Sequence, residues 1–188
     1  LTHIYYGRIS YLWYLIRDLG FIHKMYRGMA YEHISPNEMT GDTLEKPWIT
    51  AIDKFAIGGG CQYLLAADYN IAASDAYMTL PARKEGIVPG IANLRMPRFV
   101  GDRVTRQAIM ADRRLDCDGD VGRMIGDLVV PPEEVDKAIN DTIERLTTSG
   151  VVSAASNRRA IRIAFEPLDL FRTYMAVYAR EQAYCHYS

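Results

Sequence analysis

The segment 48–81 constrains the fold more than any other part of the sequence, because short apolar runs surround a single glycine-rich turn. WITAIDKFAI predicts one strand at 48–57, CQYLLAAD predicts a short helix at 61–68, and YNIAAS and AYMTLP predict two more strands around Ser74 and Asp75. Gly58, Gly59 and Gly60 separate the first strand from the helix. Nearly all-apolar strands joined by a short helix are typical of α/β folds with buried strands.

The rest of the chain is predicted to be mainly helical. Residues 9–29 form an apolar pattern broken by Arg17, an amphipathic helix is expected from Asp102 to Leu115, and a polar loop covers 30–47. Two prolines followed by two glutamates at 131–134 open another helix, in keeping with the preference for proline and acids in the first turn. Two more helices are expected, at 154–165 and beyond Pro167, the last with Phe171, Tyr174, Met175 and Tyr178 on one stripe.

Composition excludes several classes of function. The 188 residues suit one domain, and the formal net charge of -1 argues against nucleic acid as the main partner. The three cysteines lack CxxC spacing and the four histidines lack ligand spacing, so no metal site is predicted and the thiols are expected to be reduced, as in the cytoplasm. No apolar run approaches the about 20 residues of a membrane span, and no signal peptide is recognised.

The glycine turn is the strongest chemical signal. It lacks the GxGxxG pattern of a dinucleotide site, and Cys61 and Gln62 stand where a phosphate-binding P-loop has Lys and Ser or Thr. Backbone N–H groups at a helix N-terminus can bind a phosphate or stabilise an oxyanion, and a turn that merely packs a strand against a helix remains an equal alternative.

At residues 51–101, the order of an alanine-rich strand, GGG, an apolar helix, Asp68, a strand, the loop PARKEGIVPG and the helix LRMPRFVG resembles the crotonase (enoyl-CoA hydratase/isomerase) superfamily. The resemblance implies a crotonase-like α/β fold, a ββα spiral core with a helical C-terminal region. It also implies that the N–H of Gly59 helps hold the oxygen of an acyl-CoA thioester, which becomes an enolate. Because the sequence starts at Leu1 within an apolar pattern, we expect an N-terminal part of this fold to be absent from the chain.

Two positions depart from the family pattern. Hydratases of the superfamily have glutamates three residues after the oxyanion glycine and in the later P-E loop, where this chain has Gln62 and Ala82. Neither side chain exchanges protons near neutral pH, so hydration of an enoyl thioester is predicted to be lost. Gln62 still donates and accepts hydrogen bonds.

A narrower resemblance fits these departures. GGGCQ, MTLPARKEG and the C-terminal third are similar to the cofactor-independent dioxygenases of the superfamily that act on 3,5-dihydroxyphenylacetyl-CoA in glycopeptide-antibiotic biosynthesis. This implies aryl-acetyl-CoA and O2 as substrates and no cofactor. Arg17 and Gln62 would contact the polar end of the substrate, Gly58 and Gly60 would flank the thioester, Arg83 would meet CoA phosphates, and Ile87 would line a dry pocket for O2.

The domain division and the alternatives complete the expectations. We expect residues 1–150 to be the C-terminal part of the core, and 151–188 to be a helical region that covers the active site or forms a homo-oligomer, a trimer or a dimer of trimers. No general base is assigned, since Asp68 and Glu85 are interpreted as structural or solvent-facing. An ordinary acyl-CoA isomerase or thioesterase and a noncatalytic assembly subunit remain alternatives.

Overall fold

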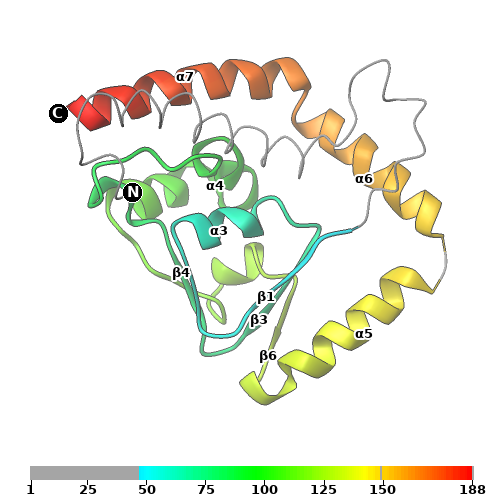
Figure 1. Ribbon diagram of the computed structural model, residues 1–188. Coiled ribbons are helices and arrows are strands. Elements are labelled where there is room, and N and C mark those ends of the chain that lie inside the picture. The colour runs from blue at the N-terminus through cyan, green and yellow to red at the C-terminus, as the bar shows by residue number, and fades with distance from the viewer. Residues whose placement is uncertain (1–46, 149, 188) are drawn as a thin grey trace.

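The computed structural model describes residues 47–148 and 150–187 of the chain. Arg17, the helix expected at 9–29 and nearly all of the loop expected at 30–47 lie outside these residues, so those expectations stay predictions. The described elements run from two short strands and α3 (Gly59–Leu64), through further strands and α4 (Ala92–Met110), to α5 (Val135–Thr147), α6 (Val151–Phe165) and α7 (Leu168–Tyr187). Figure 1 shows the strands in the lower part of the molecule and α7 running along its opposite side.

Two small sheets form the centre of the fold. The first has the order β1 (Ile49–Ile52), β3 (Tyr69–Ala73) and β6 (Leu128–Val130), all parallel. The second has the order β2 (Phe55–Ile57), β4 (Tyr77–Thr79) and β5 (Leu115–Asp116), with β2 parallel and β5 antiparallel to β4. Buried strands of the first sheet are rich in Ile and Ala, as the sequence predicts for an α/β core.

The prediction of one continuous strand at 48–57 is wrong. Ile52 pairs with Ala72 in the first sheet and Phe55 pairs with Tyr77 in the second, so the chain changes sheets at the exposed pair Asp53 and Lys54. The apolar pattern cannot show this change, because both strands bury part of their apolar side chains. The chain changes sheets a second time at the turn 74–76, between β3 and β4. The two crossings lie next to each other, because the Lys54 ammonium lies 3.2 Å from the Asp75 carboxylate.

Helix α4 confirms the expected helix start after Gly101 and differs from the prediction at its C-terminal end. It extends from Ala92, and Gly101 interrupts it with φ 74° and ψ 162°, which confirms a break at this glycine. It ends at Met110 and not at Leu115, because Asp112 adopts a left-handed φ of 54° and the chain turns away. Leu115 then pairs with Met78 in the second sheet.

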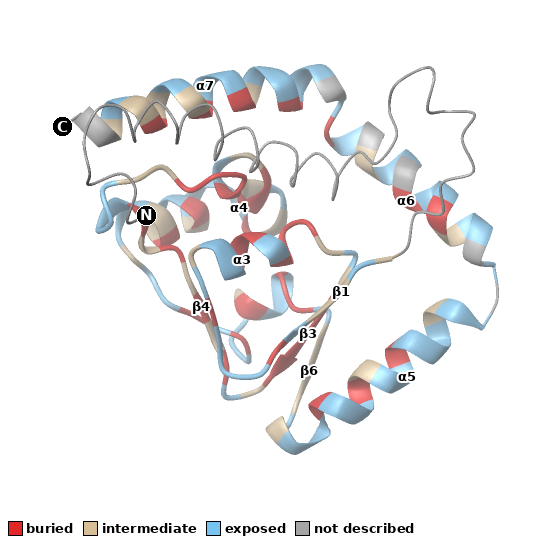
Figure 2. Cartoon of the chain, in the orientation of Figure 1, coloured by how far each residue is buried: buried red, intermediate tan, exposed pale blue. Residues whose placement is uncertain are grey.

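The core lies between the sheets and the helices α3 and α4, as the buried positions in Figure 2 show. Its most enclosed side chains include Ile71, Met78, Leu80, Ile91 and Met96. Helix α5 packs against the first sheet, where the Arg145 guanidinium lies 5.0 Å from the centre of the Tyr69 ring. On α7, Phe171, Met175 and Tyr178 are buried, which confirms the predicted stripe. The division of the chain at residue 150 stays a prediction.

Candidate active site

The glycine turn lies at the carboxyl end of the second sheet. Gly58 follows β2, has φ 54°, and donates its N–H to the carbonyl of Thr79 at 2.9 Å. Because β2 and β4 are parallel, this bond continues their ladder by one step into the turn. Gly59 is then the first residue of α3, and no side chain caps this helix end. First-turn N–H groups have no acceptor within their own helix, so the N–H of Gly59 is suited to bind a ligand oxygen.

Gln62 lies one turn further along α3 and is buried, with 7% of its surface exposed. Its Oε1 accepts a hydrogen bond of 2.6 Å from the N–H of Ile91. This bond joins the first turn of α3 to the end of the loop 86–91, which separates the 3₁₀ turn η3 (Pro81–Arg83) from α4. Gln62 therefore holds the loop against the glycine turn, a role that the sequence does not reveal. Its contact with substrate stays a prediction.

The loop 86–91 is fixed by backbone and side-chain bonds. The N–H of Ile87 donates to the carbonyl of the buried Ala82 at 2.9 Å, and the N–H of Val88 donates to Oε1 of Gln182 on α7 at 2.7 Å. The Tyr174 hydroxyl on α7 donates to the carbonyl of Gly90. Ile87 itself is half-buried. The predicted oxygen-pocket residue thus stands on a loop that α3 and α7 hold from two sides.

Arg83 has a different environment. Its side chain is exposed and pairs with the Asp112 carboxylate at 2.6 Å, and Lys84 lies 3.6 Å from the same carboxylate. Arg83 belongs to the same 3₁₀ turn as Ala82, and its contact with CoA phosphates stays a prediction. The structure brings the predicted residues Gly58, Gly59, Gly60 and Gln62 together with the loop that carries Ile87. Arg83 instead pairs with Asp112 on the surface.

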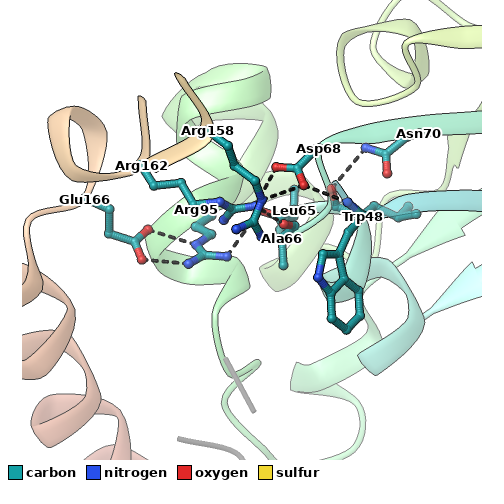
Figure 3. A network of polar contacts seen from close by, with 10 residues as sticks. Trp48, Leu65, Ala66, Asp68, Asn70, Arg95, Arg158, Arg162 and Glu166 are labelled. Atoms are coloured by element: carbon teal, nitrogen blue, oxygen red, sulfur yellow. Dashed lines mark hydrogen bonds and ion pairs between the residues drawn. The ribbon is translucent and has the colours of Figure 1, made fainter. Parts of the chain in front are cut away.

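Sequence reasoning missed a cluster of four arginines and two carboxylates at the other end of α3. Figure 3 shows Arg95, Arg158 and Arg162 of this cluster with Asp68 and Glu166. Glu166 accepts two hydrogen bonds of 2.8 Å from Arg95 and one of 2.8 Å from Arg98. Asp68 accepts from Arg158 at 2.7 Å and from Arg162 at 3.0 Å. The only sequence signal was the density of arginines in LRMPR and NRRAIR, since the partners stand 68 to 94 positions apart.

This cluster also binds the carboxyl end of α3. Arg162 donates to the carbonyl of Ala66, and Arg95 donates to that of Leu65 at 3.5 Å. Burial lowers the pKa of the Arg162 guanidinium, while Asp68 opposes that effect. Asp68 also accepts from the N–H of Trp48 at 2.8 Å, so its interpretation as a structural residue is confirmed. The other candidate, Glu85, is exposed.

Two hollows lie beside α3. One of about 360 Å³ lies between β1, β2 and α3, beside the glycine turn, and includes Ile57, Gly60 and Tyr63 in its lining. A larger one of about 430 Å³ lies at the arginine cluster and includes Phe99, Ile161 and Phe165. We assign the candidate active site to the amino end of α3, because that end carries Gly59, the predicted oxyanion donor.

The described part of the chain contains no group of three or more His, Cys, Asp or Glu side chains placed to hold a metal ion. Within that same part, no helix combines the length and apolar character needed to cross a membrane.

The chain matches a known protein family over most of its length. The model of the enoyl-CoA hydratase/isomerase family matches residues 12–180. The chain belongs to this family. Its Gln62 lies in α3 after β2, and its Ala82 lies in the 3₁₀ turn η3 after β4.

Two characterised relatives with different activities are similar to this chain. The (3,5-dihydroxyphenyl)acetyl-CoA 1,2-dioxygenase of Amycolatopsis orientalis is 47% identical over 169 residues, which cover 90% of this chain and 37% of that protein. The crotonyl-CoA hydratase of Syntrophomonas wolfei is 31% identical over 120 residues, which cover 63% of this chain and 46% of the hydratase. The chain therefore spans less than half the length of each of these relatives.

Solved structures of family members confirm the predicted crotonase fold. An enoyl-CoA hydratase from Mycobacterium avium subsp. paratuberculosis superposes with a TM-score of 0.77 at 21% identity, over 93% of this chain and 65% of that one. An enoyl-CoA hydratase/isomerase from Cupriavidus metallidurans gives a TM-score of 0.68 at 21% identity, over 100% and 64% of the two chains. At this level of identity the likeness shows the fold alone.

Proposed function

We propose that this protein is a metal- and cofactor-independent dioxygenase that converts 3,5-dihydroxyphenylacetyl-CoA and O2 into 3,5-dihydroxyphenylglyoxylate and free CoA. The observation that carries the proposal is the pairing of an intact glycine turn with Gln62 and Ala82 in place of the two hydratase glutamates. The 47% identity to the Amycolatopsis dioxygenase supports this assignment.

The first step needs only an oxyanion donor and a base. The α-carbon of the substrate lies between an aryl ring and a thioester, so its C–H bond is already acidic. As that proton leaves, negative charge develops on the thioester oxygen, and the N–H of Gly59 stabilises it at the start of α3. Arg17 and Gln62 would orient the hydroxylated ring. The base is left unassigned.

The second step uses the electron-rich enolate in place of a cofactor. The enolate transfers one electron to O2, and the two radicals combine to form a C–O bond at the α-carbon. The distal peroxide oxygen attacks the thioester carbonyl and expels the CoA thiolate, which takes up a proton. Cleavage of the O–O bond with loss of the second α-proton then leaves the ketone and the carboxylate. Both oxygen atoms of O2 remain in the product.

Exclusion of water protects this sequence from simple reprotonation of the carbanion. Ile87, half-buried on the loop 86–91, would supply apolar surface where O2 meets the enolate. Arg83, exposed beside Ala82, would contact phosphates of CoA.

The test is simultaneous measurement of O2 uptake and CoA release. The natural polypeptide that carries this sequence is purified, its intact mass is measured, and it is treated with chelator before 3,5-dihydroxyphenylacetyl-CoA is added. We expect one O2 consumed per CoA released. Release of CoA without O2 uptake would overturn the proposal in favour of a thioesterase. An isomerised thioester would favour an isomerase, and no thioester binding would favour an assembly subunit.

We also propose a cytoplasmic homo-oligomer, a trimer or a dimer of trimers. Exposed apolar side chains on the last two helices support this proposal: Val152, Ile161, Phe165, Leu170 and Val177. Light scattering tests it, and a monomer at micromolar concentration would refute it.

A further inference from the structure

The C-terminal helix α7 reaches across the molecule to one short loop. Gln182 is almost fully buried, with 2% of its surface exposed, and its Oε1 accepts from the N–H of Val88 at 2.7 Å. Tyr174, two helical turns earlier, donates its hydroxyl to the carbonyl of Gly90. Figure 1 shows α7 running along the side of the molecule that carries α3 and α4. Two side chains of one helix therefore bind two backbone groups only two residues apart.

The same loop is bound from the opposite direction by α3. Oε1 of Gln62 accepts from the N–H of Ile91 at 2.6 Å, three residues after the hydrogen bond to Gln182. Pro89, Gly90 and Ile91 are buried between these contacts. A continuous path of hydrogen bonds and covalent backbone thus runs from α7, through the loop, to the first turn of α3.

The chemistry of these contacts points to positioning and not to proton transfer. Glutamine does not titrate near neutral pH, and the phenol of Tyr174 is used as a donor to a backbone carbonyl. Ile87 precedes the first of the bound residues, so the position of its side chain depends on where Val88 and Gly90 are held. A shift of about 1 Å in groups around a reacting centre is enough to lower a rate by up to about 100-fold.

We propose that Gln182 and Tyr174 are positioning residues that set the loop 86–91 over the glycine turn, and so govern the reaction of the enolate with O2 after the enolate has formed. This inference rests on the proposed dioxygenase function. It assigns to α7 a specific effect on the second step, whereas a helix that only packs on the core would affect both steps together through stability.

Two assays separate the steps. Exchange of the substrate α-hydrogen with deuterium from solvent, measured without O2, reports formation of the enolate at Gly59. O2 uptake with CoA release reports the complete reaction. Tyr174→Phe removes one hydroxyl, and Gln182→Leu removes the acceptor for Val88. Tyr184→Phe removes a hydroxyl from an exposed position on the same helix and serves as the matched control.

We expect Tyr174→Phe and Gln182→Leu each to lower the rate of O2 uptake about tenfold, with exchange within about twofold of the wild-type rate. Tyr184→Phe should change neither rate. Gln182→Glu retains an acceptor oxygen and should recover part of the lost O2 uptake. Should Gln182→Leu not fold, the nearly isosteric Tyr174→Phe alone decides.

Equal losses of exchange and O2 uptake, or no loss of either, would overturn the positioning role while the wild-type protein still consumes O2. A wild-type protein that exchanges deuterium but consumes no O2 would instead refute the dioxygenase function, and this inference with it. The two failures are therefore told apart by the wild-type trace.

Discussion

The two ends of α3 are built from opposite kinds of residues. The amino end consists of three glycines and has no side-chain cap, with the buried amide of Gln62 one turn away. At the carboxyl end, guanidinium groups of Arg95 and Arg162 bind the carbonyls of Leu65 and Ala66 (Figure 3).

The carboxyl end of α3 therefore anchors the helix, and the amino end is the one suited to bind a ligand. Charged hydrogen bonds hold the carboxyl end of α3 to α4 and α6, so the helix has a strong anchor away from its glycine turn. The backbone N–H groups of the first turn are then available to a ligand oxygen without loss of the helix. Arginines at the carboxyl end also have the sign that the helix dipole favours.

The largest expected effect comes from removing an anchor. Glu166→Ala leaves the guanidinium of Arg95, which is 95% buried, without its carboxylate, and we expect a loss of about 3–5 kcal/mol in the free energy of unfolding. Urea denaturation measures it. Glu181→Ala, which removes an exposed pairing with Arg180, is the control and should cost about 1 kcal/mol or less. Equal small losses in both variants would show that the cluster does not anchor α3.

A substitution at the amino end should affect the rate and leave stability almost unchanged. Gly59→Pro removes the proposed oxyanion donor, and proline is well tolerated at the first position of a helix. We expect kcat to fall about 100- to 1000-fold, with a melting temperature close to that of the wild type. Among the described residues, a Cβ at Gly59 meets no atom within 4 Å, so Gly59→Ala, which retains the N–H, is the matched control. An unchanged kcat in Gly59→Pro would remove Gly59 from the mechanism.

Gln62 is expected to affect both stability and substrate binding, so its substitution tests how far the amino end of α3 also has a structural role. Gln62→Leu leaves the buried N–H of Ile91 without its acceptor, and we expect it to cost about 1–3 kcal/mol of unfolding free energy. It should also weaken binding of hydroxylated substrates in isothermal titration more than binding of phenylacetyl-CoA. Equal losses for both thioesters would show that Gln62 supports the loop and does not recognise the ring hydroxyls.

The effect that is smallest near neutral pH concerns two buried thiols, Cys61 next to the glycines and Cys117. Burial raises the pKa of Cys61 to about 12 and that of Cys117 to about 11, from 9.0 for a free thiol. Above pH 9 the unfolded chain releases these protons and the native chain retains them, so stability falls as pH rises from 9 towards 11. Each thiol contributes a slope of up to about 1.4 kcal/mol per pH unit. Unfolding at pH 8, 9 and 10 should show a shallower decline in the double variant Cys61→Ala/Cys117→Ala, and identical declines would contradict these pKa values.

The sequence predicts the turn, the short helix and the strands on both sides of it, because each is encoded by residues close together in the chain. It fails at Asp53 and Lys54, where the change of sheet depends on which strand lies alongside. Register of that kind is tertiary information, and the apolar pattern of Ile52 and Phe55 is compatible with one strand or two.

Some features of the candidate site could likewise be predicted from the sequence, and others could not. The glycines and the departures at Gln62 and Ala82 are legible in the sequence through its resemblance to the crotonase superfamily. The attachment of Gln62 to Ile91, and of Gln182 to Val88, joins residues 29 and 94 positions apart, and polar residues with such partners look like any others in a sequence. The arginine cluster escaped prediction for the same reason.

The paired changes of sheet restrict how the length of this protein can vary. Only two residues separate β1 from β2 and three separate β3 from β4, while the registers Ile52↔Ala72 and Phe55↔Tyr77 fix both crossings. A single insertion at either crossing would displace the glycine turn from Ala82 by one strand residue, about 3.3 Å, and turn the following side chains to the opposite face. Related sequences should therefore tolerate exchange of residues at 53–54 and 74–76 far more readily than insertions or deletions there.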